Sequence, residues 1–154
     1  MKIYIDKSCA DVKKSKELLI KRHYPDKNYS IERLSNGKPI IISDGKEIGC
    51  VSISHTDGVL VMAFSDKPVG IDIERYDRKI SFRICGSIEE WTKREAYGKY
   101  TGEGINKEIL NMRLPNDIIK TFNWLDYIIS VCCEEQIEGI ETLIDNTPCK
   151  CYNK

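Results

Sequence analysis

Residues 69–74 read V-G-I-D-I-E, an alternation of apolar and non-apolar positions that is typical of a β-strand. This period of two places Ile71 and Ile73 on one face of the strand and Asp72 and Glu74 on the other. Two carboxylates in that arrangement lie about 7 Å apart, which is close enough for them to share a divalent cation. We expect Asp72 to be exposed and to contribute little to stability, as surface charges usually do.

A helix is predicted further along the chain, over about residues 84–100, where Trp91, Glu95 and Lys99 recur every four residues and share one stripe. Each feature alone has an ordinary explanation, because acidic residues are common on exposed strands and Glu95 and Lys99 have the spacing of a surface ion pair. Together, the strand carboxylates, the helix carboxylate and the lysine indicate a site for a metal ion and a phosphate. Gly70, just before the carboxylates, allows close approach to the strand backbone.

The rest of the hydrophobic pattern predicts an α+β protein. An amphipathic, basic helix is expected over residues 11–24, ended by Pro25. Further strands are expected at residues 2–6, 29–34, 40–42, 51–55, 59–64, 118–124, 127–133 and 137–143. We predict a single domain over residues 1–154, with an N-terminal half (1–66), a C-terminal half (67–145) and a tail (146–154) of no clear role.

Composition and charge exclude several classes of function. The chain has 154 residues with 24 basic and 24 acidic side chains, so no overall field attracts nucleic acid. No apolar run is long enough to span a membrane, and the first residues are typical of a strand rather than a signal peptide. Cys50, Cys132 and Cys133 lie in strand-like runs, where cysteine behaves as a small core residue, and Cys149 and Cys151 lack the partners of a zinc site. We expect a reduced, cytoplasmic protein.

Four blocks of sequence carry a family resemblance. G-K-P at 37–39, S-I-S-H-T at 52–56, V-G-I-D-I-E at 69–74 and W-T-K-R-E-A-Y-G-K at 91–99 occur in the order found in the 4′-phosphopantetheinyl transferases. The chain resembles a shortened member of the double-length, surfactin-synthetase-activating type. The resemblance implies an α+β fold of two pseudo-repeated helix-plus-sheet halves with the nucleotide in the cleft between them. It also implies a monomer that transfers 4′-phosphopantetheine from coenzyme A to a serine of an acyl- or peptidyl-carrier protein.

The resemblance also implies roles for single residues. Asp72, Glu74 and Glu95 would hold Mg²⁺, the cation that favours carboxylates together with substrate phosphates. Glu95, directly or through water, would accept the proton of the incoming serine, and Lys99 would stabilise the leaving phosphate. The nucleotide contacts implied by the family are Lys38 and Pro39 beside the adenine, Ser54 and His55 on the 3′-phosphate, and one or two basic residues of the helix over 11–24.

Two features depart from the family pattern. Arg94 stands immediately before Glu95, where the family normally has lysine, and arginine spreads its charge over a planar fork. The link between strand and helix, residues 75–90, is short, and in longer relatives this segment contributes to carrier-protein docking. Two alternatives therefore stay open. One is a shortened relative that binds coenzyme A or a nucleotide without efficient transfer, and the other is an unrelated structural domain with charges only on its surface.

Overall fold

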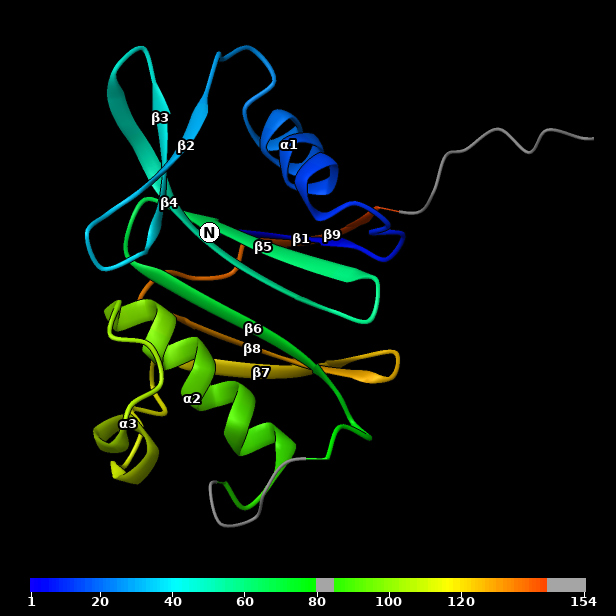
Figure 1. The fold of residues 1–154 in the computed structure, drawn as a ribbon, viewed down its shortest axis with the longest axis vertical. Coiled ribbons are helices and arrows are strands. Elements are labelled where there is room, and N and C mark those ends of the chain that lie inside the picture. The colour runs from blue at the N-terminus through cyan, green and yellow to red at the C-terminus, as the bar shows by residue number, and fades with distance from the viewer. Residues whose placement is uncertain (80–84, 144–154) are drawn as a thin grey trace, which may run out of the picture.

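The computed structural model describes residues 1–79 and 85–143 and contains two β-sheets and three helices (Figure 1). The predicted tail 146–154 lies outside the described residues. The first sheet has the strand order β2-β3-β4-β5-β1-β9, and the second has the order β6-β8-β7. The elements are β1 (Lys2–Asp6), α1 (Val12–His23), β2 (Ser30–Arg33), β3 (Pro39–Ser43), β4 (Lys46–Thr56), β5 (Val59–Ser65), β6 (Val69–Arg75), α2 (Ile88–Thr101), α3 (Lys107–Asn111), β7 (Ile119–Trp124), β8 (Tyr127–Cys133) and β9 (Gly139–Leu143).

The two sheets pack face to face between two layers of helix. Alternate residues of β1 and β5, such as Ile3 and Val61, join alternate residues of β6 and β8, such as Ile71 and Ile129, in the core between the sheets. The intervening residues of β1 and β5 point the other way, where Leu19 and Ile20 of α1 pack against them. Helix α2 covers the outer face of the second sheet, so the layers run α1, first sheet, second sheet, α2 (Figure 1).

Helix α2 lies unusually close to β6 because the strand carries glycine at the contact. A Cβ atom on Gly70 would lie 1.9 Å from the carbonyl oxygen of Ala96 and 2.5 Å from the backbone nitrogen of Tyr100. The predicted close approach to Gly70 is thus made by the backbone of α2. Helix α2 begins after Ser87, whose side chain caps it, and ends at Gly102 with φ 80°.

The strand predicted at residues 137–143 differs most from the expected arrangement. We assigned it to the C-terminal half, but β9 pairs in parallel with β1 at the edge of the first sheet. The α+β class agrees with the structure. The two sheets differ in size, with six and three strands, so the pseudo-repeat of two similar halves stays a prediction. Helix α3 was not predicted. Among the described residues, no helix is long and apolar enough to cross a bilayer.

Substituting Gly70 with alanine tests the close packing of α2 on β6. The new methyl group would collide with backbone atoms that cannot rotate away, so Gly70→Ala should lower the free energy of unfolding by about 3 kcal/mol. Gly139→Ala in β9 is the control, because a Cβ atom there would meet nothing within 4 Å. Urea unfolding of both variants gives the comparison, and equal stabilities would contradict the packing described here.

Candidate active site

A pocket of about 410 Å³ opens between the first sheet and the C-terminal end of α2. Residues from the turn before β3, from β4, and from the end of α2 with the loop after it form most of its wall. The pocket brings together five of the predicted site residues, which are Lys38, Pro39, Ser54, His55 and Lys99. The other three, Asp72, Glu74 and Glu95, are not part of its lining. The nucleotide-binding residues expected from the sequence therefore share one concave surface.

The lining of this pocket is strongly cationic. Lys16, Arg33, Lys38 and Lys99 contribute four positive charges, and no aspartate or glutamate of residues 1–79 and 85–143 contributes to the lining. In a chain of zero net charge, such a concentration of one sign creates a local field that favours an anionic ligand. The sequence did not single out Lys16 among the basic residues of α1, and it gave no signal for Arg33, which joins the pocket only through the pairing of β2 with β3.

Lys38 connects the two halves of the chain across the pocket. Its ammonium group donates a hydrogen bond to the carbonyl oxygen of Tyr100, with Nζ and O 3.0 Å apart. Tyr100 lies in the last turn of α2, where unpaired carbonyl groups carry partial negative charge that attracts a cation. The turn before Lys38 is held by Arg33, which donates to the carbonyl oxygen of Gly37 at 2.7 Å. The G-K-P block is thus fixed against the end of α2.

A buried network joins the pocket to the strand carboxylates. Lys99 Nζ lies 2.8 Å from Asp72 Oδ1 and 3.0 Å from the carbonyl oxygen of Ile71, and it donates to both. The hydroxyl of Ser54 donates to the same Asp72 oxygen at 2.7 Å. Ser52 lies two residues before Ser54 on the same face of β4. Its hydroxyl accepts a hydrogen bond from the backbone N–H of Ile71, with N and Oγ 3.0 Å apart. Strands β4 and β6 and helix α2 are therefore tied together around one carboxylate.

The two strand carboxylates lie on the same face of β6, as the alternation predicted, but they are not exposed. The side chains of Asp72 and Glu74 are only 6% and 8% exposed because α2 covers this face of the sheet. Removing the Asp72 carboxylate would leave the Lys99 ammonium without its counter-charge beneath the helix. The expectation that Asp72 is exposed is therefore wrong, and the reason for expecting it to contribute little to stability no longer holds.

Each strand carboxylate has one oxygen without a partner. Asp72 Oδ2 and Glu74 Oε2 are buried and accept no hydrogen bond from the described residues, which is costly for a charged group. In this part of the chain, no three histidine, cysteine, aspartate or glutamate side chains gather closely enough to hold an ion by themselves. Magnesium commonly takes one or two carboxylates and completes its shell with substrate phosphates and water. The two free oxygens fit such a site.

Glu95 is partly buried and close enough to Asp72 for their charges to interact. Burial raises the pKa of the Glu95 carboxyl, and the negative charge of Asp72 raises that pKa further. The positive charges of Lys99 and Arg78 oppose this rise in the pKa of Glu95. A carboxylate with a raised pKa is a better acceptor for a proton near neutral pH than an ordinary surface glutamate. Glu95 therefore lies within range of the Asp72 charge, while a shared site of Asp72, Glu74 and Glu95 stays a prediction.

Arg94 takes part in packing rather than in the pocket. Its guanidinium donates to the carbonyl oxygens of Ile109 and Met112, the latter at 3.2 Å, and pairs with Glu90 at 2.6 Å. These contacts fix the end of α3 against α2, and a planar fork with several donors suits them better than a lysine would.

An α+β protein with a cationic pocket beside buried carboxylates is suited to a phosphate-rich ligand and a divalent cation. A comparison with curated proteins shows similarity to the 4′-phosphopantetheinyl transferase gsp of Aneurinibacillus migulanus, with 31% identity over 116 aligned residues. The alignment covers 58% of this chain and 47% of the relative, so the chain spans about half the length of the curated relative it matches. No family model matches the chain. The resemblance seen in the four sequence blocks is thus confirmed as similarity to a curated transferase of this kind.

The raised pKa of Glu95 predicts a specific dependence of stability on pH. Between the ordinary pKa of about 4.5 and the raised pKa in the folded protein, the native state binds more protons than the unfolded state. The contribution of Glu95 to stability is therefore greatest below pH 4.5 and is lost as the pH rises through the folded pKa. Glu95→Gln cannot lose this proton, so its stability relative to wild type should increase from pH 4.5 to pH 7.

Urea unfolding in the presence of EDTA measures this difference, with Glu103→Gln, an exposed site outside the pocket lining, as the control. A difference between Glu95→Gln and wild type that stays constant with pH would contradict the burial of this carboxyl.

Proposed function

We propose that this chain transfers 4′-phosphopantetheine from coenzyme A to a serine of an acyl- or peptidyl-carrier protein, in a reaction that requires Mg²⁺. The observation that supports this best is the pocket, to whose lining the described part of the chain contributes four cations and no carboxylate. The Lys99–Asp72 ion pair joins this pocket to buried carboxylates. Coenzyme A carries a 3′-phosphate and a pyrophosphate, so it matches a pocket of this charge. The similarity to a curated transferase supports the same chemistry.

In this proposal, the pocket binds the nucleotide end of coenzyme A. Lys38 and Pro39 flank the adenine. His55, which is exposed at the rim, contacts the 3′-phosphate together with Ser54. Lys16 of α1 and Arg33 of β2 add further positive charge, so three of the four lining cations come from the part of the chain before β3.

The reaction takes place where the pocket meets the carboxylates. Asp72, Glu74 and Glu95 would hold Mg²⁺, which when bound neutralises the pyrophosphate and the charge that builds up during transfer. Glu95 accepts the proton of the serine hydroxyl as the serine oxygen forms its bond to the phosphorus that carries pantetheine. The bond from that phosphorus to the leaving oxygen breaks and releases adenosine 3′,5′-bisphosphate. Lys99 has three N–H groups, of which two are used by Asp72 and Ile71, and the third donates to the leaving phosphate.

The second candidate function is binding of coenzyme A or a nucleotide without efficient transfer. It is favoured by the short link 75–90, because the corresponding segment of longer relatives contributes to carrier-protein docking. For either candidate we propose a cytoplasmic monomer. The five cysteines of the described residues are free.

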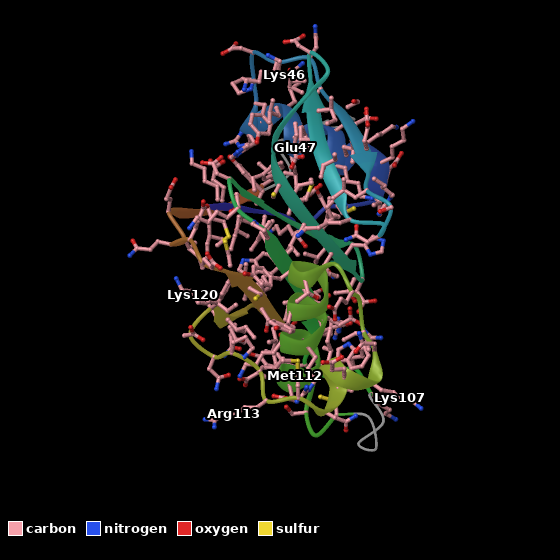
Figure 2. All side chains as sticks on the ribbon, turned by 90° about the vertical axis from the view of Figure 1, so that its left-hand side faces the viewer. Lys46, Glu47, Lys107, Met112, Arg113 and Lys120 are labelled. Atoms are coloured by element: carbon pink, nitrogen blue, oxygen red, sulfur yellow. The ribbon has the colours of Figure 1, made fainter. Side chains whose placement is uncertain are left out.

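Transfer itself is tested by the mass of the carrier protein. Several apo-carrier proteins incubated with the chain, coenzyme A and Mg²⁺ should gain the mass of 4′-phosphopantetheine, and Glu95→Gln should slow this gain at least about a hundredfold. Lys46→Gln is the matched surface control, because Lys46 lies at the far tip of the β3–β4 hairpin (Figure 2). If no carrier protein gains mass while coenzyme A still binds, the second candidate function replaces the first.

The role of His55 is tested by a pair of ligands. His55→Ala should weaken the binding of coenzyme A by about tenfold and leave the binding of 3′-dephospho-coenzyme A nearly unchanged, because only the former carries the phosphate. Isothermal titration calorimetry of both ligands measures the ratio. Equal losses for the two ligands would place His55 away from the 3′-phosphate.

A further inference from the structure

Arg78 places a second cation beside the carboxylates, and it reaches them from the surface. Its guanidinium pairs with Oε1 of Glu74, four residues earlier in the chain. The Glu74 side chain is only 8% exposed, whereas the Arg78 side chain is 47% exposed. A buried carboxylate is therefore neutralised by a side chain that is half in water.

The formal charges of this cluster are nearly balanced without a metal ion. Asp72, Glu74 and Glu95 carry three negative charges, while Lys99 and Arg78 carry two positive charges. Lys99 neutralises Asp72, and Arg78 pairs with Glu74. A divalent cation added to all five groups would turn one excess negative charge into one excess positive charge. Binding of the ion is therefore favoured if one of the resident cations moves away.

Arg78 is the cation that can move. Lys99 is held under α2 by Asp72 and by the carbonyl oxygen of Ile71, and both of these contacts belong to the packing of the helix on β6. Arg78 follows the end of β6, and within the described residues Glu74 is the acid with which it forms an ion pair. A half-exposed arginine gains hydration when it leaves its partner, so the cost of displacing it is small.

From these contacts we infer that Arg78 is a displaceable counter-ion whose positive charge opposes the binding of a divalent cation at Glu74. Arg78 pairs with Oε1 of Glu74, whereas the metal would use the free Oε2. The inference rests on the metal site of the proposed function. In the metal-free protein, Arg78 satisfies a buried carboxylate that would otherwise be unpaired. When the metal binds, Arg78 turns out to solvent, so the metal must displace it and binds more weakly than it would to the carboxylates alone.

The substitution Arg78→Gln should therefore have two effects of opposite sign. The metal-free protein should lose stability, because Glu74 is left without its counter-charge. The affinity for the metal should increase, because nothing has to be displaced. A residue with a purely structural role would not produce this combination, since general destabilisation weakens a metal site.

Calorimetric titration with Mn²⁺ as the probe tests the inference on the full chain. We expect the Kd of Arg78→Gln to be roughly tenfold below that of wild type, and the Kd of Arg78→Lys to lie between them. Lys79→Gln is the matched control, since it removes the same charge from the exposed neighbouring position, and its Kd should stay within roughly twofold of wild type. Glu74→Gln should greatly weaken Mn²⁺ binding, which would assign the measured site. Thermal unfolding in EDTA should show a lower Tm for Arg78→Gln than for Lys79→Gln.

The outcomes separate this inference from the function on which it rests. Equal Mn²⁺ affinities for wild type and Arg78→Gln would overturn the competition while leaving the metal site in place. Equal gains in affinity for Arg78→Gln and Lys79→Gln would also overturn it, because general charge repulsion would then account for both. If neither wild type nor Arg78→Gln binds Mn²⁺, the inference and the metal-dependent part of the proposed function fail together.

Discussion

The partly buried ion pair between Lys99 and Asp72 is the interaction on which the arrangement of the site depends. It joins α2 to β6, and Ser54 extends it to β4, so one carboxylate oxygen receives hydrogen bonds from two different elements. Burying these charges is costly unless their hydrogen bonds are satisfied, and the pair therefore constrains how the helix can lie on the strand. Gly70 allows the helix to come close enough for Lys99 to reach both Asp72 and the backbone of Ile71.

The same pair sets the chemistry of the two surfaces that meet there. Lys99 belongs to the cationic pocket. Asp72 and Glu74 are the buried carboxylates of β6, and each has one oxygen without a hydrogen-bond partner among the described residues. A ligand that carries phosphate groups and a divalent cation could bridge both surfaces. Buried charged groups that keep an unpaired oxygen add little net stability to the fold. They are well suited to bind a charged ligand.

Local periodicity correctly predicted the strand and the helix that carry the candidate site residues. The alternation of residues 69–74 placed Asp72 and Glu74 on one face, and the four-residue spacing placed Glu95 and Lys99 on one side of α2. Both arguments depend only on positions close in the chain. They did not predict burial, because the sequence does not say that α2 packs on the face of β6 that carries the carboxylates.

Long-range pairing accounts for the features that were missed. Arg33 reaches the pocket because β2 pairs with β3, and Lys16 reaches it because α1 packs on the first sheet. Strand β9 returns from the end of the chain to pair in parallel with β1, a partner more than a hundred residues away. A hydrophobic run predicts a strand, but it does not identify the sheet that the strand joins.

The central claim is that the cationic pocket and the carboxylates act as one site that is bridged by substrate and metal. The most direct test is the Kd of coenzyme A measured by calorimetry in Mg²⁺ and in EDTA, since two ligands that share a site change each other's affinity. We expect Mg²⁺ to lower the Kd of coenzyme A by roughly tenfold. The Kd of adenosine 3′,5′-bisphosphate should fall less, because only coenzyme A carries the pyrophosphate. The same Kd for coenzyme A in Mg²⁺ and in EDTA would contradict the account.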